Sequence, residues 1–77
     1  MVAWQDIDRY VLDVLILRYP ERVSIAKVMD ILMMPVKLVK PSLDRLTQSG
    51  YAVTDEWGFW WVTDKGLKGG ISTPLEG

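Results

Sequence analysis

The sequence predicts a small α+β domain in which three helices precede a two-stranded antiparallel hairpin. An apolar face recurs at Val39, Leu43 and Leu46, the four-then-three spacing of an amphipathic helix over about residues 37–49. Gly50 closes that helix, and two short runs of aromatic and β-branched residues follow it, as is typical of strands. Two further stretches with helical periodicity precede the helix over about residues 37–49, and they supply the other two helices.

The hairpin strands are expected at about residues 51–55 and 59–63, joined by a turn that ends in a glycine able to adopt a positive φ. Successive side chains of a strand point to opposite faces. The large side chains of the second strand therefore divide into two pairs: Trp60 with Val62, and Phe59 with Trp61. One small core cannot bury both pairs. We expect Trp60 and Val62 to face inward, as the family resemblance given below implies.

Trp57, Phe59 and Trp61 are then expected to form an exposed apolar patch on or beside the hairpin. Exposed aromatic patches usually mark a contact with protein, either a second copy of the chain or another partner. Stacking on unpaired bases is a chemical alternative, because every base has a π face. Asp55 and Glu56 make the turn acidic, which disfavours phosphate contacts there.

Length and composition limit the possible classes of protein. A chain of 77 residues has room for one small core, so we expect a single domain over residues 1–68 and a flexible tail over 69–77. The chain has no Cys and no His, so it lacks a thiolate nucleophile, the usual general base and the commonest metal ligands. We expect no enzymatic activity, no metal and no cofactor. Neither a membrane span nor a signal peptide is indicated, and a cytoplasmic location is the default expectation.

The first helix is expected over about residues 5–19. Pro20 ends it. One apolar stripe runs along Ile7, Val11, Val14 and Leu15, and a second stripe runs along Leu12, Ile16 and Tyr19. A helix that is apolar on most sides is either central to the core or shared with another subunit. Both explanations stay open, so the second stripe is a candidate dimer contact.

The second helix is expected over about residues 24–33, with the Ser24 hydroxyl as its N-cap. Met34 is disfavoured in a helix by the proline that follows it. Two helices joined by so short a turn make a helix-turn-helix unit. Residues 20–50 carry five basic and three acidic side chains in a chain whose net charge is −1, so the positive charge lies on the middle helices. This suits a surface that faces a polyanion.

Residues 30–51 resemble the turn, recognition helix and first wing strand of winged helix-turn-helix transcription regulators. Residues 59–66 are similar to the end of the wing in small archaeal and phage repressor-like members, and Trp4 with residues 8–15 is similar to how they begin. Thr63 is expected to cap a last short turn or helix over residues 64–68. The resemblance implies a homodimeric transcription regulator, acting as a repressor, that binds double-stranded DNA with the third helix in the major groove.

The resemblance also implies which side chains contact DNA. Five would face the groove: Lys37, Leu38, Lys40, Pro41 and Asp44. Three would reach backbone oxygens: Ser42, Arg45 and Gln48. A lysine can donate to guanine O6 and N7 or to phosphate. The alternative for the same lysines is a solvated helix face.

Two residues depart from the pattern of this family. Pro41 forces either a late helix start near Lys40 or a kink. Asp44 would repel phosphate unless it accepts a hydrogen bond from cytosine N4 or pairs with Arg45 or Lys40. Together with the acidic hairpin turn, these departures support an alternative function: a winged-helix module that binds another protein through its aromatic wing and does not bind DNA.

Overall fold

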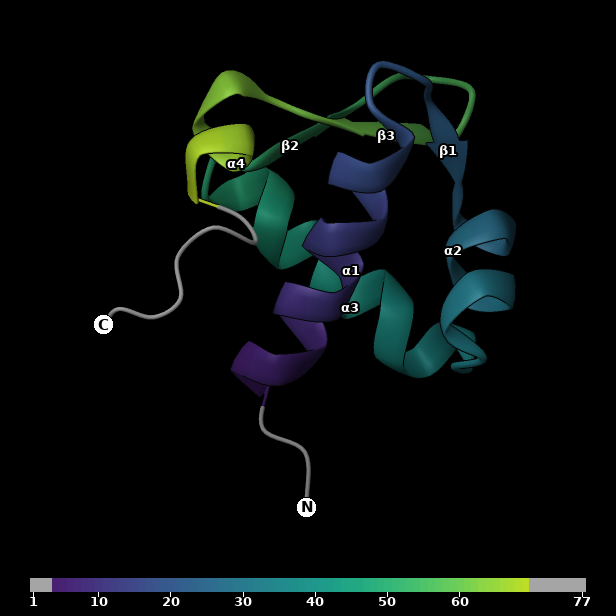
Figure 1. The fold of residues 1–77 in the computed structure, drawn as a ribbon. Coiled ribbons are helices and arrows are strands. Elements are labelled where there is room, and N and C mark those ends of the chain that lie inside the picture. Colours follow the sequence, from purple (N-terminus) through teal and green to yellow (C-terminus); the bar gives the residue numbers. More distant parts are fainter. Residues whose placement is uncertain (1–3, 70–77) are drawn as a thin grey trace.

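The computed structural model describes residues 4–69, and within this range it contains four helices and one three-stranded antiparallel sheet (Figure 1). The elements in chain order are α1 (Trp4–Arg18), β1 (Val23–Ser24), α2 (Ile25–Leu32), α3 (Val36–Gln48), β2 (Ala52–Thr54), β3 (Phe59–Val62) and α4 (Asp64–Gly69). The predicted α+β class is confirmed. The ends of α1, α2, α3 and the hairpin strands lie within one residue of the boundaries expected from the sequence. Most of the expected tail lies outside the described residues.

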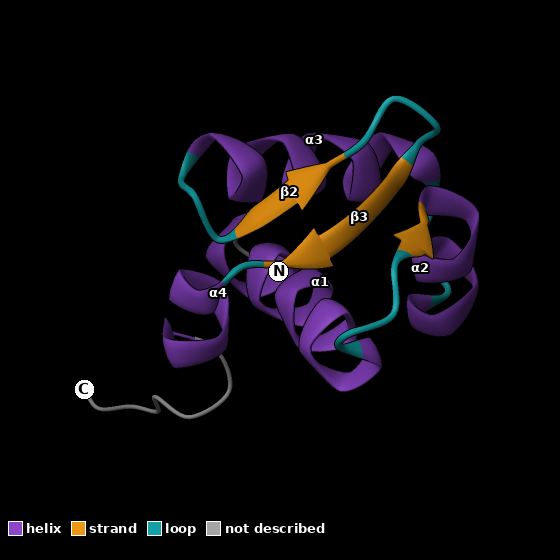
Figure 2. Ribbon diagram, turned by 90° about the horizontal axis from the view of Figure 1, so that it is seen from above, coloured by secondary structure: helices purple, strands orange, loops and turns teal. Residues whose placement is uncertain are grey.

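The sheet has the order β1-β3-β2, with β3 between the two other strands (Figure 2). Val23 lies opposite Trp60, and Ala52 lies opposite Val62. The sequence predicted the hairpin of β2 and β3 but not β1, because a strand of two residues has no alternation that could reveal it. The sheet lies across the top of the molecule in Figure 1, with α1, α2 and α3 beneath it.

Helix α1 lies at the centre of the fold and packs against α2, α3, α4 and β3. Val11 and Leu15 are fully buried, and Leu12 is only 6% exposed. Ile16 is half-buried against the same core. The second apolar stripe is therefore covered mainly from within the chain, and the predicted role of Leu12 in a dimer contact is wrong. Of that stripe, Tyr19 is exposed to solvent.

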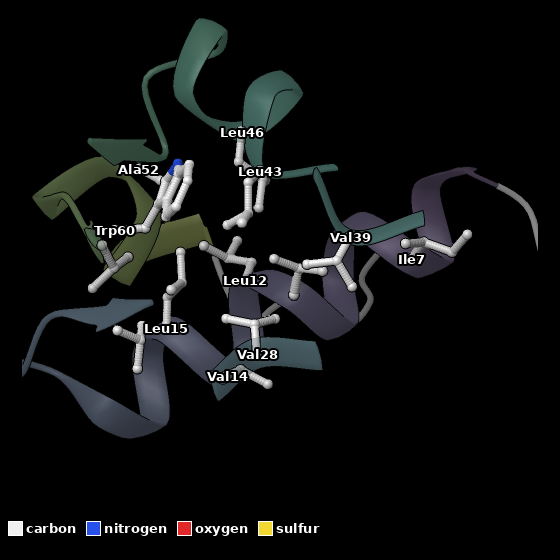
Figure 3. Packing of buried hydrophobic residues seen from close by; sticks show 13 residues of the cluster. Ile7, Leu12, Val14, Leu15, Val28, Val39, Leu43, Leu46, Ala52 and Trp60 are labelled. Atoms are coloured by element: carbon white, nitrogen blue, oxygen red, sulfur yellow. The ribbon is translucent and has the colours of Figure 1, made fainter. Parts of the chain in front are cut away.

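The hydrophobic core contains residues of α1, α2, α3 and the sheet (Figure 3). Leu43 of α3, Val28 of α2, Leu15 of α1 and Trp60 of β3 all belong to one cluster of buried hydrophobic residues. Trp60 is 6% exposed and Val62 is 2% exposed, so the predicted inward face of β3 is confirmed. Burial of each large apolar side chain contributes about 1.5–3 kcal/mol, and this packing fixes α3 against α1 and the sheet.

The residues at the ends of α2 and at the start of α3 explain where these two helices begin and end. Ser24 caps α2 as predicted, since its Oγ accepts a hydrogen bond of 3.2 Å from the Lys27 N–H. Met33 ends α2 in the left-handed conformation, with φ 55°. Helix α3 then begins at Val36 and continues through Pro41, so the structure excludes a late start near Lys40, one of the two alternatives for this proline.

Thr63 and Gly66 attach α4 to the rest of the fold. The Thr63 Oγ1 accepts from the Gly66 N–H at 3.1 Å and donates to the Gly50 carbonyl at 2.6 Å, so the predicted cap is confirmed. A Cβ at Gly66 would collide with the Tyr51 carbonyl oxygen. Only glycine therefore fits between α4 and the start of the hairpin.

Each helix within residues 4–69 is too short or too polar to cross a membrane.

Candidate nucleic-acid interface

Helix α3 has one face in the core and one face in solvent. Its buried side chains are Val39, Ser42, Leu43 and Leu46. Its opposite side carries a row of side chains at three- and four-residue spacing, which we call the outer stripe: Lys37, Lys40, Pro41, Asp44 and Gln48. Lys37, Lys40 and Gln48 are exposed, and Pro41 and Asp44 are half-buried. The structure thus brings five of the eight predicted DNA-contact residues together on one accessible row.

Lys40 and Asp44 form an ion pair within the outer stripe. The Lys40 Nζ lies 3.0 Å from each carboxylate oxygen of Asp44. Both side chains remain about half exposed, at 48% and 49%. Of the explanations offered for an acid on this side of the helix, pairing with Lys40 is the one that the structure contains. Exposed pairs of this spacing contribute only about 0.3–0.5 kcal/mol to stability, so a ligand can displace the pair at low cost.

Ser42 does not belong to the interface. It is fully buried, and its Oγ donates a hydrogen bond of 2.6 Å to Asp8 Oδ1 of α1. The prediction that Ser42 reaches a DNA backbone oxygen is therefore wrong. The sequence contained a signal: Ser42 lies three residues after Val39 and four before Leu46, which places it on the buried stripe.

Arg45 is held against α1 by the same carboxylate. Its Nε donates to the Asp8 oxygens at 3.1 and 3.0 Å, and its Nη2 donates to Oδ1 at 2.7 Å. Burial raises the pKa of Asp8, but the hydrogen bonds from Arg45 and Ser42 and the Arg45 charge lower it more, so the net shift is downward. A phosphate contact by Arg45 would require this bidentate pair to break. Sequence analysis missed this role of Asp8, which lies 37 positions from Arg45 in the chain.

Leu38 also departs from the expected interface, since it is half-buried and packs against the core. Its side chain can therefore present only part of its surface to a ligand. The accessible polar groups of α3 are concentrated in Lys37, Lys40, Asp44 and Gln48.

The turn of the hairpin is organised by Asp55. Its Oδ1 accepts from the backbone N–H groups of Trp57 and Phe59 at 2.9 and 3.0 Å, and its Oδ2 lies 3.4 Å from the Arg22 Nη1. Gly58 has φ 85°, the positive φ expected of it. The Asp55 carboxylate is thus used by the turn itself, whereas Glu56 is exposed.

The hairpin carries an aromatic surface formed by Trp57 and Phe59, which are 71% and 39% exposed. With Arg22 and Asp55 they line a shallow hollow of about 300 Å³. Trp61 was expected in the same patch, but it is half-buried, and the Arg22 guanidinium lies 4.1 Å from the centre of its ring. The exposed aromatic surface therefore consists of two residues instead of the predicted three, and the Arg22 guanidinium lies beside it.

A second exposed apolar surface lies between α1 and α2. Leu17 is 75% exposed and Ile31 is 41% exposed, and they line a shallow hollow of about 250 Å³ with Val14 and Arg18. Sequence analysis missed this surface because Leu17 belongs to neither apolar stripe of the first helix. The signal was a large aliphatic residue on the polar side of that helix.

Comparison with known proteins gave no match to a family model, a curated protein or a solved structure.

Proposed function

We propose that the chain binds duplex DNA as a small transcription regulator of the winged helix-turn-helix class, with α3 in the major groove. The order of the elements, with α2 and α3 separated by a short turn and followed by the hairpin, is compatible with that class. The position of β3 between β1 and β2 is compatible with it as well. In this proposal α2 and α3 form the helix-turn-helix, and β2 and β3 form the wing.

The outer stripe of α3 is the observation that carries the proposal. It presents Lys37 and Lys40 in the first half of a helix whose opposite side is anchored in the core. Within residues 4–69, Lys37 has no ion-pair partner, so its ammonium is available to a phosphate or a guanine. The partial positive charge at a helix N-terminus adds to the same local field.

Fluorescence anisotropy of a labelled, mixed-sequence duplex tests this proposal. The protein is titrated at several salt concentrations, and affinity should fall linearly on a log-log plot, because binding releases counterions from phosphates. Lys37→Ala should weaken binding across sequences and reduce the salt slope by about one if the side chain contacts a phosphate. Lys68→Ala removes the same charge from α4 and is the matched control, with no expected change in slope. Absence of binding at low salt overturns the proposal.

A contact with protein through the hairpin is the second candidate function, favoured by the 71% exposure of Trp57. An exposed indole of this size is typical of the centre of a protein interface. In the proposed regulator this contact joins two copies of the chain. The competing surface for a dimer is the hollow beside Leu17.

Light scattering on the purified protein distinguishes the two surfaces. A dimer that becomes a monomer with Trp57→Ala, but not with Leu17→Ala, assigns the interface to the hairpin. The reverse result assigns it to the surface between α1 and α2. A monomer at all concentrations overturns the homodimer and leaves DNA binding to a single copy.

A further inference from the structure

We infer that Lys40 and Asp44 act as one recognition unit for a G·C base pair, an inference that rests on the proposed function. The two groups lie in hydrogen-bond contact, with the Lys40 Nζ 3.0 Å from both Asp44 oxygens. They therefore present a donor and an acceptor side by side on the outer stripe of α3.

The major-groove edge of a G·C pair has a matching arrangement. Guanine presents two acceptors, N7 and O6, and cytosine presents the N4 amino donor beside them. O6 and N4 are themselves hydrogen-bonded in the base pair, so they too lie at hydrogen-bond distance from each other. The ammonium of Lys40 can donate to N7 and O6 while Asp44 accepts from N4.

An A·T pair does not offer this match. Its donor, adenine N6, lies between the acceptors adenine N7 and thymine O4, and a methyl group adjoins O4. A carboxylate placed on N6 would be close to two acceptors. Lys40 would meet one strong acceptor instead of two, next to an apolar group. The pair therefore favours G·C over A·T.

The charge of Asp44 gives independent support for a role at bases. A carboxylate on the contact side of the helix repels phosphates, so it weakens binding that depends on the backbone alone. Arg45, the basic residue next to Asp44 in the chain, cannot offset this repulsion, since its guanidinium binds Asp8. Beside Lys40, this carboxylate can accept from a second donor, and cytosine N4 is the donor that the groove provides along with the guanine acceptors.

Selection from a pool of duplexes with a randomised core tests the inference, with wild-type protein and Asp44→Asn compared. Wild-type protein should select a G·C pair at one position by about fivefold or more over A·T. An asparagine amide pairs with adenine N6 and N7, so Asp44→Asn should shift that position toward A·T. It should also tighten binding to unselected duplex, because a negative charge has been removed.

Glu56→Gln is the matched control, since it removes one negative charge from the exposed hairpin turn and leaves α3 unchanged. It should leave the selected sequences as they are. If Asp44→Asn tightens binding but selects the same sequences as wild type, the inference is overturned and the proposed DNA binding stands. If neither protein binds any duplex, both fail. The Lys40–Asp44 pair is exposed and contributes little to stability, so each variant should melt at nearly the wild-type temperature. Thermal melting of each variant checks this and excludes loss of fold as the cause of a changed selection.

Discussion

Two ion pairs on α3 differ in almost every physical respect. Arg45 pairs with Asp8 of α1, and Ser42 donates to the same carboxylate from a fully buried position. Lys40 pairs with Asp44 one turn along the same helix, with both side chains about half exposed. The first pair ties two helices together, and the second is a local contact of an exposed helix face.

The difference shows that a basic residue on a recognition-like helix need not be available to a ligand. Release of Arg45 would leave the part-buried Asp8 carboxylate without its cationic partner, which costs free energy. Release of Lys40 exposes two groups that water already reaches. The first pair should therefore govern stability, and the second should govern binding. The predictions below test this division, from the largest expected effect on stability to the smallest.

Asp8→Ala should lower the free energy of unfolding by about 2–3 kcal/mol, because it leaves the buried Ser42 hydroxyl without this acceptor and removes the carboxylate that binds Arg45. Urea denaturation followed by far-UV circular dichroism measures the change. A loss no larger than that of an exposed surface substitution would show that the pair does not hold α3 against α1.

Ser42→Ala should cost about 1.5 kcal/mol, the low end of the range for a hydrogen bond to a charged acceptor, because Asp8 keeps its Arg45 donors. The same denaturation experiment measures it. Combining it with Asp8→Ala in a double-mutant cycle should give a cost smaller than the sum, because both changes remove the same contact. Simple additivity would contradict the shared network.

Two of the three acidic residues of α1, Asp8 and Asp13, should respond to pH with opposite signs. The folded-state pKa of Asp8 is lowered, so its stabilising contribution is complete above the unfolded-state pKa and is lost as pH falls through the folded value. Burial raises the pKa of Asp13, and within residues 4–69 its Oδ1 has no hydrogen-bond partner. Folding therefore favours its neutral form, and protonation of Asp13 restores some stability as pH falls through that raised pKa.

Urea midpoints of wild type and Asp8→Ala, measured from neutral to acidic pH, should converge in acid. Asp13→Asn should be more stable than wild type at neutral pH, and this gain should shrink in acid. If the difference in urea midpoint between wild type and Asp8→Ala stays constant down to the lowest pH, the lowered pKa assigned to Asp8 is contradicted.

Lys40→Ala and Asp44→Ala should each change the free energy of unfolding by no more than about 0.5 kcal/mol. The reason is the exposure of both side chains in the folded state. Thermal melting at low and high salt measures the effect, which should diminish with salt as charges are screened. A loss comparable to that of Asp8→Ala would remove the distinction between the two pairs.

The local chemistry of the chain was largely predictable from sequence. Periodicity located α3, the hydroxyl of Ser24 indicated the start of α2, and strand alternation placed Trp60 and Val62 on one face of β3. Each of these features depends on residues that are neighbours along the chain. Local patterns are the signals that a single sequence carries best.

The contacts that define the candidate site were not predictable in the same way. Asp8 and Arg45 are separated by 37 positions, and no local pattern relates them. Ser42 could have been placed inside from its spacing, but its acceptor could not have been identified. Leu12 illustrates a different limit, since an apolar stripe looks the same whether its cover comes from the same chain or from a second copy.

The unequal burial of the tryptophans gives the protein two optical reporters. The indole of Trp60 is shielded in the core, whereas that of Trp57 is open to solvent. In a chain that carries Trp4→Phe and Trp61→Phe, acrylamide should quench the Trp57 emission at once and reach Trp60 only when the fold opens. A single quenching titration then reports core integrity and occupancy of the hairpin separately, without an attached dye.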